Sequence, residues 1–270
     1  MRSQSTPRSS TQYSPIAKRA KTESITSPST QHHEHHASHV TGSSSNIVSI
    51  IQTMKHQEFT TYRQLPYLTN NVEVTRSDRH AMCQWGFSIL DACKVDRHFA
   101  IVALTFFDRF LSCRGLRSVE ACLARQQEFQ LAYITCLIIA LKSREAMNIT
   151  PTFAAETMCD GMYFPEEFVN LEIEILRALS WRLNGPTPQD FIQHFIELMP
   201  ASADENAVNM LVKVANGNAE IAMTDYDVAM ESYSCIALAS IAAALRTVGP
   251  MFESREWMNR VAFVMSDALD

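Results

Sequence analysis

The sequence predicts an all-α protein, and two observations carry that prediction. Apolar side chains recur every three or four residues over most of the chain, as on the buried face of a helix, and the alternating pattern of a strand is nearly absent. The chain is 46% hydrophobic with only seven glycines, which is typical of a globular protein. Its 270 residues are enough to bury a substantial core in one or two domains.

Residues 1–45 are expected to form a disordered tail, because they are rich in Ser, Thr, Gln and His and have no aliphatic pattern. The basic cluster Lys18-Arg19-Ala20-Lys21 suits nuclear import, and a few solvated charges are the alternative. On this basis we expect the protein in the nucleus and the cytoplasm. Residues 32–36 contain four histidines, but nothing around them fixes a coordination geometry, so we predict no metal site.

Helical periodicity then predicts a lead helix and five further helices before residue 185. The lead helix covers residues 46–56, and a connector containing Pro66 follows it. The five helices are expected at residues 77–92, 96–113, 128–144, 151–159 and 165–179. Between the second and third of them, residues 114–126 form a link with room for one turn of helix. The helix at 128–144 is apolar nearly all round, which marks the most buried element.

A second group of helices begins after the break at Asn184-Gly185-Pro186. Thr187 is a capping residue and Pro188 suits the first helical position. Helices are expected at residues 187–198, 204–222, 228–248 and 254–268. Their order resembles that of the first group. The sequence thus predicts a tail (1–45), a first domain with its lead helix (46–184) and a C-terminally shortened second copy (185–270).

A buried ion pair is predicted between Arg79 and Asp108. Asp108 shares a helix face with Leu104 and other apolar residues, and an unpaired carboxylate in a core is very costly. If the two helices turn back on each other near Lys94, Arg79 and Asp108 lie at about the same height. Such a pair can fix the register of two helices. The alternative is two surface charges that match by chance.

Several motifs in a fixed order resemble the cyclin box. They are Arg79, Met82 and Trp85, then Phe107-Asp108-Arg109-Phe110-Leu111-Ser112, Phe129-Gln130-Leu131 and Ala140-Leu141-Lys142-x-x-Glu145. The resemblance runs from about residue 46 to the C-terminus. It implies a cyclin-like helical bundle with a five-helix first box and a shortened second box. It also implies a regulatory subunit of a cyclin-dependent kinase. The link at 114–126 departs from the family, since it is longer than in most cyclins.

The sequence indicates no catalytic site and no cofactor. It lacks a Gly-rich phosphate loop, G-x-S-x-G and H-E-x-x-H, and His80, His98 and His194 are isolated on helices. The tail holds five Lys and Arg against two Asp and Glu, which leaves 18 against 27 for the rest. This acidic body argues against nucleic acid as a partner. The apolar runs are too short to span a bilayer, and seven cysteines without a C-x-x-C pair suggest reduced thiols inside the cell.

Two charged residues are candidates for binding a kinase. Lys142 ends an apolar run, where the simpler reading is a cation at a helix C-terminus, and Glu172 lies among apolar residues of its helix. The resemblance implies that both hydrogen-bond the backbone of the kinase, and each charge is expected to await that partner. Leu176, Trp181 and Leu183 would supply apolar contacts. Ser143 replaces a common Phe, and Trp181 would fill the space.

The resemblance also implies a patch that docks kinase substrates or inhibitors. It maps to Ala81, Met82, Trp85, Phe129 and Gln130. Asp78 and Ser88 depart from the family pattern, and core packing is the alternative for Met82 and Trp85. Two other functions remain open at this point: a cyclin-fold adaptor in transcription, and a cyclin-like scaffold that has lost its kinase.

Overall fold

Helices and loops account for all the residues that the computed structural model describes, which are 44–69, 71–144, 146–198 and 204–248. The predicted all-α class is confirmed. The helices are α1 (Ser44–Phe59), α2 (Arg76–Cys93), α3 (His98–Leu111), α4 (Arg117–Ala124), α5 (Gln126–Ser143), α6 (Pro151–Phe153) with the π-helix η2 (Ala154–Met158), α7 (Pro165–Ala178), α8 (Pro188–Glu197), α9 (Glu205–Thr224), α10 (Tyr226–Ala229) and α11 (Tyr233–Val248). The predicted tail up to residue 43 and the helix at 254–268 lie outside these residues.

The lead helix α1 is longer than predicted, since it begins at Ser44 and ends at Phe59. Its last turn is held by a contact that no local pattern shows. Glu58 is buried, and its carboxylate accepts hydrogen bonds from the amide of Ser234, at 3.1 Å, and from the Ser234 hydroxyl. A carboxylate at the start of α11 suits the positive end of that helix. This contact with α11 thus accounts for a helix that continues beyond the end that its apolar pattern predicts.

The link at 114–126 contains a complete helix, α4, rather than a single turn. Val119 and Cys122, three residues apart, are both buried, so one face of α4 packs into the core. The side-chain amide of Asn71 donates to the carbonyl of Leu123 at 2.8 Å and so caps the C-terminal end of α4.

The prediction of a single helix at 228–248 is wrong, because the chain forms two helices there, α10 and α11. Asp225 caps α10 by accepting hydrogen bonds from the amides of Asp227 and Val228. Ser232 then starts α11: its hydroxyl accepts from the amide of Cys235 at 3.4 Å. Two caps within eight residues favour two helix starts over one continuous helix.

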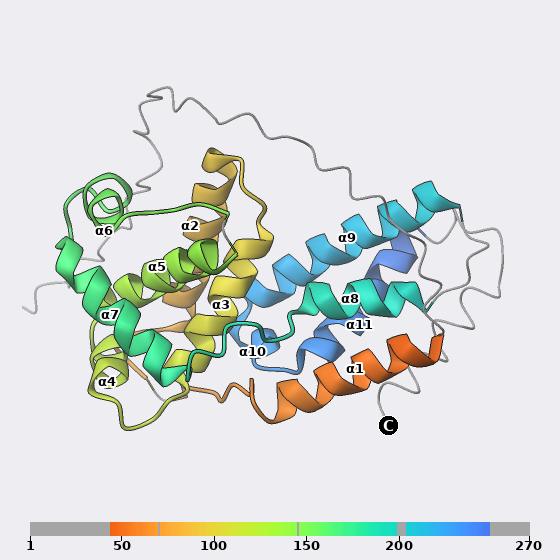
Figure 1. The fold of residues 1–270 in the computed structure, drawn as a ribbon, viewed down its shortest axis with the longest axis horizontal. Coiled ribbons are helices and arrows are strands. Elements are labelled where there is room, and N and C mark those ends of the chain that lie inside the picture. The colour runs from red at the N-terminus through yellow and green to blue at the C-terminus, as the bar shows by residue number, and fades with distance from the viewer. Residues whose placement is uncertain (1–43, 70, 145, 199–203, 249–270) are drawn as a thin grey trace, which may run out of the picture. The chain divides into compact units, whose positions relative to one another are not determined.

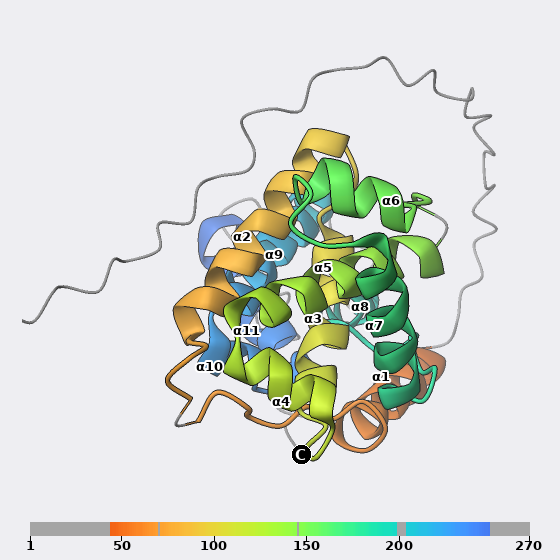
Figure 2. The ribbon, with the colours of Figure 1, turned by 90° about the vertical axis from the view of Figure 1, so that its left-hand side faces the viewer.

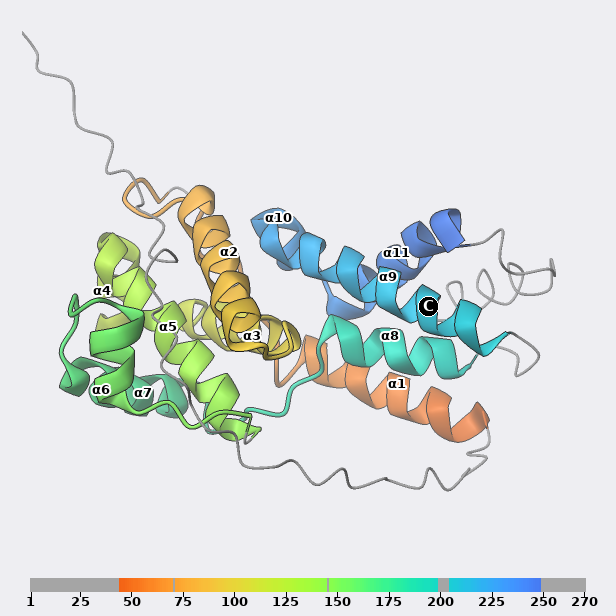
Figure 3. The same cartoon turned by 90° about the horizontal axis from the view of Figure 1, so that it is seen from above.

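Helix α5 is the centre of the first helical group, α2 to α7. Every residue from Leu131 to Leu141 is buried, as its apolar composition predicts. Helices α2, α3, α4 and α7 all pack against it (Figure 2). The second helical group consists of α8 to α11. Within it, α9 packs against α8 and α11, and the lead helix α1 lies along α8 (Figures 1 and 3).

The Arg79–Asp108 pair is present and completely buried. Arg79 Nε donates to Asp108 Oδ1 at 2.9 Å and Arg79 Nη2 donates to Oδ2 at 2.7 Å, with both side chains at 0% exposure. This bidentate geometry is the strongest form of such a pair. Burial alone would lower the pKa of Arg79, but the Asp108 carboxylate outweighs burial and raises that pKa above its ordinary value.

The same pair joins the two helical groups. Arg79 Nη1 donates to the carbonyl of Met223 at 2.9 Å, close to the negative C-terminal end of α9. Tyr67, in the connector after α1, donates its hydroxyl to Asp108 Oδ1 at 2.7 Å. The Tyr226 hydroxyl in turn accepts from the amide of Tyr67 at 2.7 Å. One buried network therefore holds α2, α3, the connector and the second group together.

Replacing Asp108 by Asn should lower the free energy of unfolding by about 3–5 kcal/mol, because the Arg79 charge loses its buried counter-ion. Denaturant unfolding followed by circular dichroism measures this loss. The double variant Arg79→Met/Asp108→Leu removes both charges and should be more stable than Asp108→Asn. A single variant as stable as the unchanged chain would contradict the role given to the pair.

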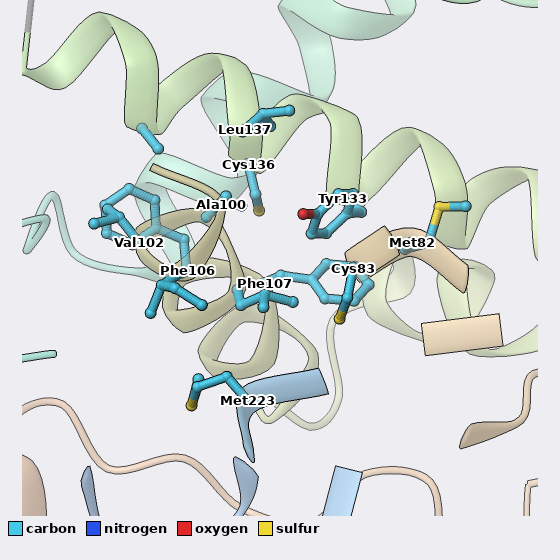
Figure 4. Close-up of a cluster of buried hydrophobic side chains, with 14 of the residues drawn as sticks. Met82, Cys83, Ala100, Val102, Phe106, Phe107, Tyr133, Cys136, Leu137 and Met223 are labelled. Carbon is cyan, nitrogen blue, oxygen red and sulfur yellow. The ribbon is translucent and has the colours of Figure 1, made fainter. Parts of the chain in front are cut away.

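A second close contact in the core lies between Gly86 of α2 and Tyr133 of α5. Figure 4 shows Tyr133 among Cys83, Phe107 and Cys136. The Tyr133 hydroxyl is buried and has no hydrogen-bond partner among the described residues. A Cβ added at Gly86 would lie 2.1 Å from that hydroxyl oxygen. Only glycine therefore lets α2 approach α5 this closely while Tyr133 keeps its position.

Gly86→Ala should cost about 1–3 kcal/mol of unfolding free energy through overpacking. Tyr133→Phe alone should be neutral or stabilising, because it removes an unsatisfied buried hydroxyl. The double variant should regain much of the loss, although the ring carbons Cζ and Cε1 stay 3.0 and 3.1 Å from the new methyl group. Equal losses in the single Gly86→Ala variant and the double variant, measured by denaturant unfolding, would show that the hydroxyl is not the obstacle.

Candidate partner-binding face

Lys142 and Glu172 lie together on the first helical group, one in the last turn of α5 and the other in the middle of α7. The Lys142 Nζ atom donates to Glu172 Oε2 at 2.8 Å and to Oε1 at 3.0 Å. The expectation that each charge awaits an outside partner is wrong in this respect, since each is paired with the other. The two helices bring together residues 30 positions apart in the sequence.

This pair differs from the buried one in its access to solvent. The side chains of Lys142 and Glu172 are 30% and 22% exposed, against 0% for Arg79 and Asp108. An ammonium group has three donors and a carboxylate has about four acceptor positions, so both groups keep hydrogen-bonding capacity beyond their mutual contact. The arrangement can bind a backbone carbonyl and a backbone amide of another protein side by side.

Apolar side chains flank this pair on α7. Val169 and Ile173 are 43% and 39% exposed. Val169, three residues before Glu172, lies on the same side of α7 as Glu172, and Ile173 lies beside Val169 one turn further along. Neither residue was predicted from the sequence. The two residues are four positions apart and lie opposite the buried Leu171, and this spacing was the signal in the sequence for an exposed apolar stripe. Of the predicted apolar contacts, Leu176 is largely buried and Leu183 is partly buried against the core.

Trp181 is the largest exposed apolar side chain near the end of α7, at 65% exposure. It adopts a left-handed backbone conformation with φ of 59°, directly after Ser180 with φ of 53°. Its amide donates to the carbonyl of Leu176 at 2.9 Å, which closes the C-terminal end of α7. Such a conformation is unusual for a bulky residue. The helix end therefore fixes an indole outside the core.

The candidate docking patch offers little apolar surface. Met82 and Phe129 are buried, with 6% and 1% exposure, whereas Ala81, Trp85 and Gln130 are half-buried. Trp85 packs edge-on against Tyr133, as core packing predicts. Asp78, which departs from the family pattern, accepts hydrogen bonds from Thr75 in a capping box at the start of α2. The sequence T-x-x-D was the signal for that structural role.

Burial shifts the pKa values of two titratable side chains of the first helical group. Burial raises the pKa of the Cys83 thiol to about 11, so this cysteine stays protonated beside Arg79. Burial also lowers the pKa of His98. The described residues contain no cluster of three or more His, Cys, Asp or Glu placed to hold a metal ion. Among them, no helix is both long and apolar enough to cross a membrane.

Comparisons with known proteins show the family and the fold of this chain. The family model "Cyclin, N-terminal domain" matches residues 49–184, and the model "Cyclin, C-terminal domain" matches residues 186–267. The fold is similar to the X-ray structure of a viral cyclin from herpesvirus saimiri, with a TM-score of 0.56 and 18% identity over 82% of this chain and 97% of that chain.

Curated relatives include the G1/S-specific cyclin-D1 of Xenopus laevis, 29% identical over 73% of this chain and 64% of its own length. The rat protein of the same name is 30% identical over 64% of this chain and 55% of its own length. The chain thus spans between about half and two thirds of these relatives. Both family models together cover nearly all of the chain after the predicted tail. The chain belongs to the cyclin family.

Proposed function

We propose that this chain is a non-catalytic regulatory subunit that binds and activates a cyclin-dependent Ser/Thr protein kinase in the cell cycle. The observation that carries the proposal is the Lys142–Glu172 pair, which is partly exposed and flanked by apolar side chains of α7. Family membership supports it, and the name of the curated relatives, G1/S-specific cyclin-D1, supports a role in the cell cycle.

The binding step uses both kinds of contact on this face. Lys142 donates to a backbone carbonyl of the kinase and Glu172 accepts from a backbone amide, which fixes the orientation of the partner. Exposed Trp181, with Val169 and Ile173, supplies apolar area that is removed from water on binding. Hot spots of protein–protein interfaces usually combine an aromatic anchor with a few oriented polar groups.

Activation follows from differential binding and needs no chemistry from this chain. The rigid first helical group packs against the regulatory helix of the kinase and favours the arrangement in which that helix completes the ATP site. Lys142 and Glu172 are already held by each other in the free chain, so little free energy is lost in ordering their side chains on binding. The basic residues 18–21 support a location in both nucleus and cytoplasm.

Replacing Lys142 and Glu172 together by Ala should weaken kinase binding by about 2 kcal/mol or more, which is about 30-fold. Capture from a panel of cyclin-dependent kinases, followed by a histone kinase assay, measures the effect. The matched variant is the exchange Lys142→Glu/Glu172→Lys, which keeps an ion pair but swaps donor and acceptor, and it should weaken kinase binding at least as much. Full kinase binding and activity with either double variant, at unchanged helicity, would refute the proposal.

Trp181→Ala should weaken kinase binding by about 2 kcal/mol while changing unfolding free energy by less than about 0.5 kcal/mol. The reason is that the indole is mostly exposed in the free chain. Ile221→Ala is a suitable control, because Ile221 is 71% exposed on α9, outside the proposed face. Equal effects of the two substitutions on affinity, measured by titration calorimetry, would remove Trp181 from the interface.

A further inference from the structure

A groove of about 650 Å³ lies between α4 and α7 and reaches Glu128 and Leu131 near the start of α5. The floor is apolar and buried, and consists of Cys122, Leu131 and Leu171. Leu116, on the rim just before α4, is 39% exposed. The groove exists because the link at 114–126 folds as a helix that stands beside α7. Its volume falls in the range of sites that bind small ligands or short peptides.

The two ends of the groove carry opposite charges. Arg117 and Arg177 line one end, where the thiol of Cys113, four residues before Arg117, lies 3.9 Å from the carbonyl of Ala178 at the end of α7. The positive N-terminal end of α4 adds to this potential.

Glu128 and Glu167 line the opposite end. There the Tyr163 hydroxyl donates to the carbonyl of Gln127 at 3.0 Å, which joins the start of α7 to the start of α5. Glu174 lies between the two ends, on the wall that α7 forms. The apolar floor thus runs from a basic end to an acidic end.

Several of these charges are not used within the described part of the chain. Arg117, Arg177 and Glu174 are exposed and make no ion pair or side-chain hydrogen bond there. At the acidic end, Glu128 contacts Arg125 at 3.1 Å and Glu167 caps the start of α7. Both arginines therefore remain available to a carboxylate from another molecule, and Glu174 to a cation.

We propose that this groove binds an extended peptide segment of another protein. The segment has apolar side chains at its centre, an acidic residue at the Arg117–Arg177 end and a basic residue at the Glu128–Glu167 end. Glu167 and Arg177 are ten helical residues apart, about 15 Å, which an extended chain covers in about five residues.

Such a segment and a kinase can bind at the same time. Glu174 follows Glu172 by two residues, which puts their side chains about 200° apart around α7. The groove and the proposed kinase-binding face therefore lie on different sides of one helix. The groove is suited to recruit a third protein to the complex, and its occupancy does not require the proposed function to be correct.

An array of hexapeptides tests the proposal on the full chain. The peptides carry Asp or Lys at each end, in all four combinations, with mixed Leu, Val, Ala and Phe between them. The two sets with opposite terminal charges should bind about threefold more tightly than the two sets with like charges, because two exposed ion pairs form instead of one. This preference should weaken at high salt.

Two variants assign the binding to the groove. Ala121 lines the groove on α4 and is half-buried, so Ala121→Trp should fill the space and remove peptide binding. Arg177→Glu should shift the preference to peptides with Lys at both ends. Equal binding of all four sets, or a preference that both variants leave unchanged, would overturn the proposal. Circular dichroism of the Ala121→Trp variant shows that the fold is intact, and kinase capture by the same variant reports separately on the proposed function.

Discussion

The buried ion pair between Arg79 and Asp108 is the constraint on which the rest of the structure depends. Two charges with no solvent access are tolerated only when nearly every donor and acceptor is satisfied. That requirement brings the connector to Asp108 through Tyr67 and the end of α9 to Arg79 through the Met223 carbonyl. The pair thus sets the register of α2 on α3 and places the second helical group as well.

The Arg79–Asp108 pair and the Lys142–Glu172 pair have different physical roles. Removing one partner of the buried pair leaves an uncompensated charge in the core, so the integrity of this pair determines the stability of the fold. The Lys142–Glu172 pair is partly exposed, and pairs of that kind contribute little to stability. Its position among exposed apolar residues of α7 is better explained by binding than by folding. Paired charges are also pre-oriented, which reduces the ordering cost on association.

Sequence patterns predicted the features that repeat along one element or depend on helix rise. Asp108 on an apolar face required a partner, and counting residues from Lys94 identified Arg79. The apolar run from Leu131 to Leu141 identified the central helix. The family resemblance identified Lys142 and Glu172, and the structure brings them into contact.

What the sequence could not show are the contacts between distant segments. Nothing near Glu58 indicates that it caps α11, and nothing near Tyr67 indicates that it reaches Asp108. The break between α10 and α11 was missed because the caps Asp225 and Ser232 compete with a strong apolar periodicity. Likewise, the mutual pairing of Lys142 and Glu172 depends on the packing of α5 against α7, which no pattern within either helix specifies.

The proposed kinase-binding face is formed by the end of α5 and the outer side of α7. Hydrogen–deuterium exchange of the full chain, with and without a bound cyclin-dependent kinase, locates the interface. Binding should slow exchange in segments containing Lys142, Glu172 and Trp181 and leave α9 and α11 unchanged. Protection confined to the second helical group, with no change around Lys142 and Glu172, would contradict this position of the interface.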